Sequence, residues 1–209
     1  LSIEDYDRQI AKTREFLARL NVIDESALPA DLRVDYGIIK TSLEDEVEGS
    51  AYDHSRYVLF TNRGGWFMSL PSLANRSPFF TAADYESYLQ RLEAYPAYNA
   101  QGIERSRVAV EKGLTQACEP MEGTVERLST LVAGAPEESV FYGPFRQKPS
   151  TIDDAQWAAF QARARETIAD DVYPAYEDFF KFYRGEYEPE CRTGAPGVAA
   201  TPGGAEYYD

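Results

Sequence analysis

The chain has 209 residues, and its 35 acidic against 21 basic residues give a net charge of −14. Such a surplus of acids argues against nucleic-acid binding, which needs clustered cations, and against binding to an anionic membrane surface. No apolar run approaches the roughly 20 residues that cross a bilayer, so no membrane span is expected. The acidity fits a soluble protein and, more weakly, a cationic or neutral partner.

The first 50 residues are predicted to form two helices. Ser2 is a candidate N-cap, and apolar side chains recur at helical spacing up to Leu20. After a connector, Pro29 suits the first turn of a second helix. The apolar stripe of this second helix comprises Leu32, Tyr36, Ile39, Leu43 and Val47. Each helix is therefore expected to pack through one face.

Residues 49–80 break this periodicity. Two adjacent glycines, two prolines and many aromatic residues predict a long, partly buried loop, with a short extended piece at 57–60. Loops of this length are usually functional or held in place by packing.

Helical periodicity resumes after residue 80. Thr81 is placed to cap a helix that Pro96 ends, and the next helix ends near Gly113. Pro120 and Gly134 then mark the start and the end of another helix.

The longest apolar stripe predicts a long helix over residues 151–185. Thr151 precedes Asp154 by three positions, which resembles a capping box. Pro174 lies inside the stripe and should kink this helix or split it in two.

The predicted fold class is therefore mainly α. We expect a multi-helix, bundle-like region with long aromatic-rich loops and a kinked long helix near residues 151–185. The helical domain is predicted over residues 1–185. A Gly- and Pro-rich segment follows over 186–209, and its tyrosines indicate that it packs against another surface.

No complete active site can be assembled from the residue pattern. His54, the only histidine, has neither a second imidazole nor an obvious nucleophile beside it, so a structural role is favoured. Ser69 lacks the setting of a nucleophile elbow, and Asn75 matches only the short glycosylation pattern. The acidic run of Glu44, Asp45, Glu46 and Glu48 is typical of a solvated helix face. A zinc site built from this chain alone is not expected.

The aromatic residues suggest binding more than catalysis. Fifteen tyrosines are many for a chain of this length, and several fall in predicted loops. Core packing explains most of them. The remainder would suit a groove that holds a peptide, because tyrosine offers a flat apolar face and a hydroxyl group.

The two cysteines, Cys118 and Cys191, lie far apart and outside any CxxC pair. They would form a disulfide in an exported protein and stay as two free thiols in a cytosolic one. The chain begins with Leu1, which is compatible with removal of a signal peptide. The residue pattern leaves both states of the cysteines open.

The C-terminal stretch VYPAYEDFFKFYRGEYEPECRTGAPGVAATPGGAEYY resembles one found in the bacterial DUF885 family. There, a helix with a Tyr-Pro-x-Tyr element leads to a Gly-rich segment and a tyrosine pair. Two segments, VEKGLTQACEPMEGTVERL and ESVFYGPFRQKPSTI, are similar to the preceding parts of that family. The opening LSIEDYDRQIAKTREFLARLNVIDESALPADLRVDYGIIKTSLE is similar to its N-terminal helical part. The resemblance covers nearly the whole chain.

The resemblance implies a longer, largely helical protein that looks like a zinc metallopeptidase of the gluzincin type. The family's metal motif, a His-Glu pair with a following histidine, lies in a C-terminal part that this sequence lacks. No metal ligand or catalytic glutamate therefore carries over to any residue here, and zinc is expected only in the full-length protein. The ending TPGGAEYYD then looks like an internal junction.

Location also follows from the resemblance. Many family members are exported or lipid-anchored, which agrees with a Cys118–Cys191 disulfide and with a periplasmic, lipoprotein or secreted protein. A cytoplasmic location stays open.

Three functional hypotheses follow. In the first, this region is inactive alone and forms a wall or lid of a peptidase cleft for short peptides, with its own missing C-terminal region as partner. The second is a non-enzymatic helical module that binds a peptide or protein, and the third is a purely structural helical domain. The residues expected nearest the cleft are Gly203, Gly204, Tyr207 and Tyr208, for which the competing interpretation is a tight turn and a packing pair. Arg63 is a further candidate, as a contact for the carboxylate of a peptide end.

Overall fold

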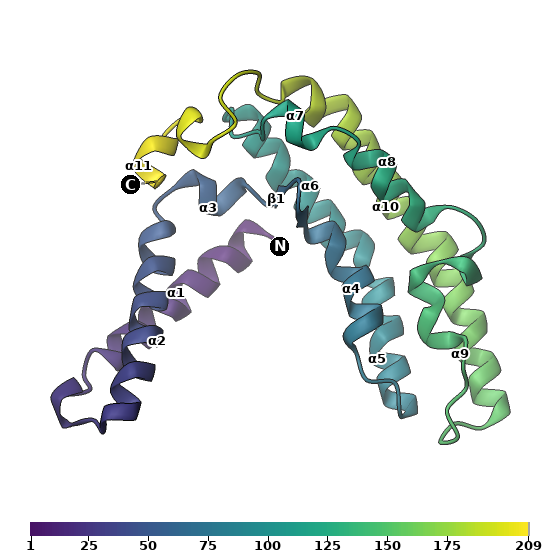
Figure 1. Ribbon diagram of the computed structural model, residues 1–209. Coiled ribbons are helices and arrows are strands. Elements are labelled where there is room, and N and C mark those ends of the chain that lie inside the picture. The colour runs from purple at the N-terminus through teal and green to yellow at the C-terminus, as the bar shows by residue number, and fades with distance from the viewer. Residues whose placement is uncertain (209) are drawn as a thin grey trace.

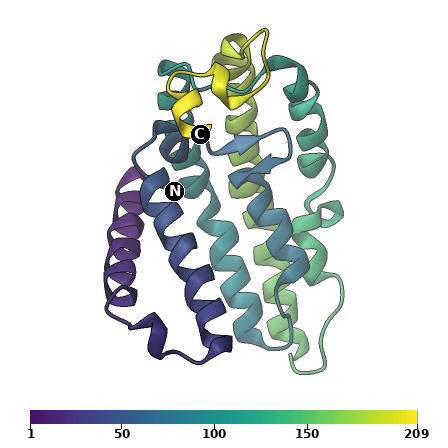
Figure 2. The ribbon, with the colours of Figure 1, turned by 60° about the vertical axis from the view of Figure 1, so that its left-hand side comes forward.

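The computed structural model describes residues 1–208, and its helices form two arms that meet at one end (Figure 1). The smaller arm is a hairpin of α1 (Ile3–Leu20) and α2 (Ala30–Gly49). Figure 2 shows the larger arm as a bundle of helices that run side by side. Its helices are α4 (Ser69–Arg76), α5 (Ala82–Glu93), α6 (Tyr95–Glu111), α7 (Cys118–Met121), α8 (Thr124–Ser129), α9 (Asp154–Thr167) and α10 (Tyr173–Phe182). The prediction of a mainly α fold is confirmed.

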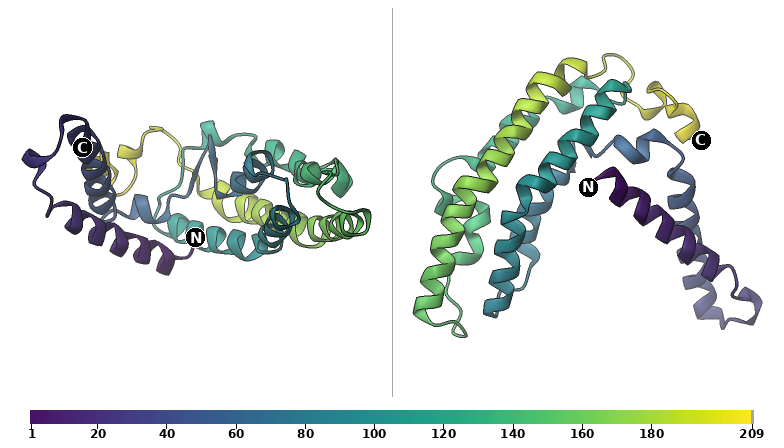
Figure 3. Two further views of the ribbon diagram at one scale, coloured as in Figure 1. Left: turned by 90° about the horizontal axis from the view of Figure 1, so that it is seen from below. Right: turned by 180° about the vertical axis from the view of Figure 1, so that it is seen from behind.

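Short elements join the arms. They are α3 (Asp53–Tyr57) and a two-stranded antiparallel hairpin of β1 (Phe60–Thr61) and β2 (Gly64–Gly65). The chain ends in α11 (Gly204–Tyr208), which returns to the neighbourhood of α3. Seen from behind, the arms diverge away from the end where α3 and α11 lie (Figure 3, right).

Several turns are tighter or wider than an α-helix. The 3₁₀ turns are Glu25–Ala27, Trp66–Met68, Thr130–Val132, Pro136–Glu138, Val140–Phe145, Glu188–Glu190 and Val198–Ala200. The π-helical turns are Ile168–Val172 and Tyr183–Tyr187. The predicted boundary after residue 185 falls within the second π-helical turn. The segment from residue 186 onward, which we call the tail, therefore continues directly from the bundle.

The first helix of the smaller arm begins as predicted, but the second helix buries fewer apolar side chains than expected. The Ser2 side chain accepts the Asp5 backbone N–H at 3.2 Å, which confirms the N-cap of α1. Of the stripe predicted for α2, only Tyr36 is buried, whereas Leu32 and Ile39 are 48% and 50% exposed. The expectation of a buried stripe is therefore wrong for much of α2, because α1 covers only one side of it (Figure 1).

The long loop predicted over 49–80 is wrong for most of its length. This stretch contains α3, the β1–β2 hairpin and α4, and only the extended piece near Phe60 was anticipated. The aromatic residues that suggested a loop are core residues, since Phe60, Trp66 and Phe67 are all buried. Pro71 lies in the first turn of α4, where a missing N–H leaves no hydrogen bond unmade.

Prolines and glycines also determine where helices begin and end in the middle of the chain. The predicted cap at Thr81 is confirmed, because the Thr81 backbone N–H donates to the Asp84 carboxylate at 2.8 Å. Pro96 was expected to end α5, but it lies in the first turn of α6. Gly113, with a φ of +68°, follows the end of α6 as predicted. The single helix predicted from 120 to 134 is wrong, since Gly123 adopts a φ of +69° and separates α7 from α8.

A π-helical turn interrupts the long C-terminal helix close to Pro174, where a kink or a split was predicted. The π-helical turn Ile168–Val172 lies directly before α10, which carries Pro174 in its first turn. The cap was misplaced, because Asp153, not Thr151, accepts the Gln156 backbone N–H at 2.8 Å. The Thr151 hydroxyl instead donates to the Phe80 carbonyl group.

Buried polar contacts hold the bundle together. The Trp66 indole N–H donates to the Asn99 amide oxygen at 3.0 Å, and the Asn99 amide nitrogen donates to the Ala175 carbonyl oxygen at 2.7 Å. The Tyr176 hydroxyl donates to the Phe67 carbonyl oxygen at 2.5 Å. These bonds tie the 3₁₀ turn Trp66–Met68, which leads into α4, to α6 and α10. Across residues 1–208, no helix combines the length and the apolar character that a membrane crossing needs.

Candidate functional site

A pocket of 580 Å³ lies where α1, the end of α2, α3 and α11 meet. We call it the junction pocket. Four tyrosines and four acids line it: Tyr6, Tyr52, Tyr207 and Tyr208, and Asp45, Glu46, Glu48 and Glu206. Its lining contains no basic residue within the described chain. The acidic run of α2, expected to be only a solvated face, therefore also forms one wall of a pocket.

His54 anchors the tail beneath this pocket. Its imidazole is buried, and its Nε2 is hydrogen bonded to the Thr201 hydroxyl. The Tyr207 ring stacks on the imidazole, with 4.9 Å between centroids and 13° between planes, and packs edge-on against Tyr52 at 5.5 Å. α11 is thus held against α3 by packing and by a hydrogen bond.

The protonation of His54 follows from its partner. The Thr201 hydroxyl donates its single hydrogen to the Val198 carbonyl oxygen, so it accepts from His54. This places a hydrogen on Nε2, and the lowered pKa described next favours the neutral form of the ring. Burial lowers the pKa of His54, Asp53 opposes this and Arg192 adds to it. His54 therefore serves the fold as a neutral hydrogen-bond donor, in line with the structural role favoured from the sequence.

Gly203 and Gly204 form the turn that enters α11. Gly203 has a φ of +67°, a conformation that favours glycine. Gly204 is buried, and a Cβ atom there would clash with the Val198 carbonyl oxygen. Both glycines thus have a structural reason to be present. Of the four predicted cleft residues, Tyr207 and Tyr208 line the junction pocket, and the two glycines position them.

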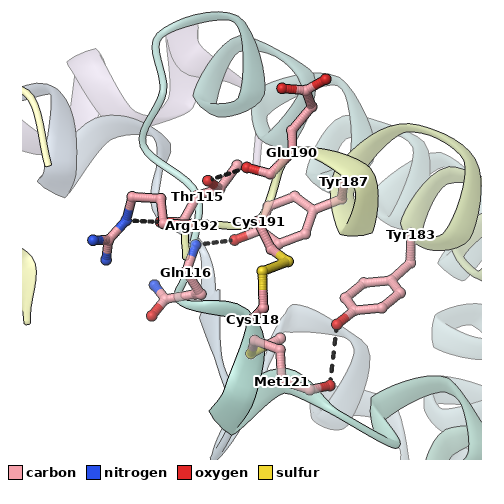
Figure 4. Close-up of a disulfide and its surroundings, with 9 residues drawn as sticks. All are labelled: Thr115, Gln116, Cys118, Met121, Tyr183, Tyr187, Glu190, Cys191 and Arg192. Atoms are coloured by element: carbon pink, nitrogen blue, oxygen red, sulfur yellow. Dashed lines mark hydrogen bonds between the residues drawn. A yellow bond between two sulfur atoms is a disulfide. The ribbon is translucent and has the colours of Figure 1, made fainter. Parts of the chain in front are cut away.

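A disulfide between Cys118 and Cys191 ties the tail to the bundle, with 5.0 Å between the Cα atoms (Figure 4). Next to it, Ala117 and Arg192 form a parallel bridge, in which the Cys118 N–H donates to the Arg192 carbonyl oxygen at 2.9 Å. The tail therefore leaves the bundle along a fixed path.

Buried groups around the disulfide complete this attachment. The Tyr187 hydroxyl accepts the Gln116 N–H at 2.9 Å, and the Tyr183 hydroxyl donates to the Met121 carbonyl oxygen at 3.2 Å (Figure 4). Burial raises the pKa of Tyr187 to about 12, so its phenol stays protonated at neutral pH. The Arg192 guanidinium donates to the Thr115 carbonyl oxygen at 2.8 Å.

Arg63 lies in a second pocket, of 230 Å³, between the β1–β2 hairpin and α8. We call it the arginine pocket. Its apolar lining comprises Phe67, Met68, Leu128 and Leu131. The second arginine at its edge, Arg127, is fixed by hydrogen bonds to the Glu122 carbonyl oxygen at 2.8 Å and to the Thr124 hydroxyl at 3.1 Å. Arg127 could not be predicted from the sequence as a partner of Arg63, because no local pattern links α8 to the hairpin.

The two pockets are opposite in charge. No acid lines the arginine pocket within residues 1–208, and neither arginine has a carboxylate within ion-pair distance there. The junction pocket is lined by α1, α2, α3 and α11, and the arginine pocket by the β1–β2 hairpin and α8 of the larger arm (Figure 1). Taken separately, the junction pocket suits a cationic group and the arginine pocket an anionic one.

The residues of this chain do not fit a zinc ion. Within the described part of the chain, no group of three or more histidine, cysteine, aspartate or glutamate side chains is placed to hold a metal. Both cysteines are in the disulfide, and the Nε2 of His54 is bonded to Thr201. We therefore derive no metal-dependent step from these residues.

Comparison with known proteins gives the family. The profile described as "Bacterial protein of unknown function (DUF885)" matches residues 1–209. The chain belongs to the DUF885 family. The resemblance noted in the sequence is thereby confirmed over the whole chain. Both pockets lie within the matched residues.

A solved structure from Colwellia psychrerythraea, described as a candidate lipoprotein, has the same fold as this DUF885 chain. The TM-score is 0.85 at 17% sequence identity, and the match covers 100% of this chain. It covers 37% of the Colwellia chain, so the DUF885 region described here spans little more than a third of that protein. No curated protein matches the chain.

Proposed function

We propose that this DUF885 chain forms one wall of a peptidase cleft that receives short peptides, within a protein longer than these 209 residues. The observation that carries the proposal is the presence of two oppositely charged pockets on this chain, the junction pocket and the arginine pocket. A short peptide has an ammonium group at one end and a carboxylate at the other. The junction pocket suits the first and the arginine pocket suits the second.

The junction pocket offers two attractions for a cation. Its carboxylates provide opposite charge, and tyrosine rings attract a cation through their faces. Arg56 and Arg105 already lie over the Tyr6 ring and Tyr207 stacks on His54, so Tyr52 and Tyr208 would provide this attraction. The four carboxylates have no ion-pair partner within residues 1–208, so a ligand would not have to displace one. A peptide N-terminus, or a lysine or arginine side chain, has the matching chemistry.

The arginine pocket suits a peptide C-terminus with an apolar side chain. A guanidinium group binds a carboxylate in a planar, often bidentate arrangement. Arg63 and Arg127 supply this group, while Phe67 and Leu128 supply apolar contact surface. This assigns to Arg63 the role that its charge suggested in the sequence.

Hydrolysis would be carried out by the part of the protein outside this chain. The family resemblance implies zinc there, where a bound metal ion would activate water and polarise the scissile carbonyl group. The residues described here would bind and orient the peptide and restrict access by large substrates. They would be inactive alone.

The same pockets support a second candidate, a non-enzymatic module that binds peptides. Both candidates predict peptide binding, and only the first predicts zinc and hydrolysis in the longer protein. For either one we propose an exported protein, since a disulfide persists in oxidising compartments and the Colwellia relative is described as a candidate lipoprotein.

The test is the zinc content and peptide hydrolysis of the full-length gene product, with the 209-residue chain as control. About one zinc per full-length chain and none in the control is expected, together with hydrolysis of short peptides by the full-length protein alone. Absence of zinc and hydrolysis after metal supplementation, with peptide binding retained, would favour the binding module. A gene that stops at codon 209 would exclude the peptidase.

A further inference from the structure

The surface of the α1–α2 hairpin is rich in exposed apolar side chains. Seven of the eleven large apolar side chains exposed among residues 1–208 lie between positions 16 and 39. They are Phe16, Val22, Ile23, Leu32, Val34, Ile38 and Ile39, and we call them the hairpin surface. A concentration of this kind on one element marks an interaction site more often than a solvated face.

α2 carries these side chains on two sides. Leu32 and Ile39 share a stripe with the buried Tyr36. Val34 and Ile38, four positions apart, lie roughly 160° and 120° around the helix axis from Leu32, and they are 62% and 61% exposed. α1 covers one side of α2 only, so a second body is needed to cover the other.

We propose that the hairpin surface docks against the part of the same protein that lies outside residues 1–209. This rests on the longer protein of the proposed function. The Colwellia chain shares this fold at a TM-score of 0.85, and the match covers only 37% of it. A protein of that length has a body large enough to bury a two-helix hairpin, whose helices gain most of their stability from such packing.

A second copy of this chain is a poorer occupant on grounds of charge. Each chain carries a net charge of −14, so two copies repel one another. α2 itself has six acids and two bases, so two α2 helices side by side would each carry net negative charge. The acids are Asp31, Asp35, Glu44, Asp45, Glu46 and Glu48, and the bases are Arg33 and Lys40.

Docking would have a consequence for the cleft. The arms meet only at one end, and the hairpin diverges from the bundle beyond it (Figures 1 and 3). A body bound to the hairpin surface would fix the angle between the arms. It would thereby set the position of the junction pocket relative to the arginine pocket.

Amide hydrogen exchange of the full-length gene product tests the docking. We expect the amides of α2 near Val34 and Ile38 to exchange at least tenfold more slowly in the full-length protein than in the 209-residue chain. The double variant Val34→Ser/Ile38→Ser should lose most of this protection in the full-length protein. Phe80→Ser, which changes a side chain that is 71% exposed on the other arm, is the control and should leave it unchanged.

The exchange results test the docking of the hairpin surface independently of the peptidase hypothesis. Equal exchange of α2 in both proteins, or protection that the double variant leaves intact, would overturn the docking even if zinc and hydrolysis are present. Retained protection in a protein without zinc would uphold the docking and reject the peptidase. A 209-residue chain that sediments as a dimer, and as a monomer after Val34→Ser/Ile38→Ser, would assign the surface to a second copy and overturn it.

Discussion

The imidazole of His54 and the ring of Tyr207 stack 4.9 Å apart, although one belongs to α3 and the other to α11. Together with the hydrogen bond from His54 to Thr201, this contact holds the C-terminal tail against α3. It also builds one side of the junction pocket, because Tyr207 lines that pocket. The stability of the tail and the shape of the pocket therefore depend on the same pair.

The first prediction concerns pH. Because burial lowers the pKa of His54 below its ordinary 6.5, the unfolded chain binds a proton that the folded chain does not. The contribution of His54 to stability is present above about pH 6.5 and is lost as pH falls below it, by at most about 1.4 kcal/mol per pH unit. Urea unfolding at pH 7.5 and 5.5 measures this loss. His54→Gln keeps a donor for Thr201 and should remove this part of the pH dependence; an unchanged dependence would contradict the assignment.

The second prediction concerns the turn before α11. Gly204→Ala places a Cβ atom against the Val198 carbonyl oxygen, which cannot move without breaking the turn. We expect a loss of about 1–3 kcal/mol in the free energy of unfolding, as for other overpacked sites. Gly197→Ala is the matched control, since Gly197 has a φ of −72° and open space around its Cβ position. Equal stability of the two variants would show that the turn is not constrained.

The third prediction concerns the disulfide. Cys118 and Cys191 are 73 positions apart, so the cross-link removes considerable entropy from the unfolded chain. The chain-entropy relation gives about 4 kcal/mol for a loop of this size, and measured values typically fall between about 2 and 4. The double variant Cys118→Ser/Cys191→Ser should unfold at a correspondingly lower denaturant concentration. Alkylation of both cysteines without prior reduction would show that the bond is absent.

The fourth prediction concerns peptide recognition. Arg63→Gln and Arg127→Gln should each weaken binding of a short peptide with a free C-terminus by about tenfold, roughly the strength of one charge-assisted contact. An amidated peptide should bind the wild-type chain more weakly and should be insensitive to both changes. Lys12→Gln, on the exposed side of α1, serves as the control for loss of one positive charge. Calorimetry measures the affinities, and equal losses for the free and amidated peptides would argue against a carboxylate site.

Local signals in the sequence determined much of the secondary structure. Ser2, Thr81 and Gly113 act within one or two turns of the chain, so their roles as caps and stops were predictable from neighbouring residues alone. Pro174 likewise marks where the regular α-helical pattern of the last long helix is interrupted, next to a π-helical turn. The aromatic stretch over 49–80 was misread, because a buried aromatic core and an aromatic-rich loop have the same composition.

The sequence by itself determined the helical class, the family and the residues available for chemistry, because periodicity, order of motifs and composition are properties of the chain. Only the tertiary structure decided which of them meet. Tyr207 reaches His54 through a tail fixed by the disulfide, and Arg63 and Arg127, far apart in the sequence, line the same pocket. The exposure of Val34 and Ile38 is likewise determined by the tertiary structure. A helical pattern shows that one face of a helix is apolar, but it does not show whether a neighbouring element covers that face.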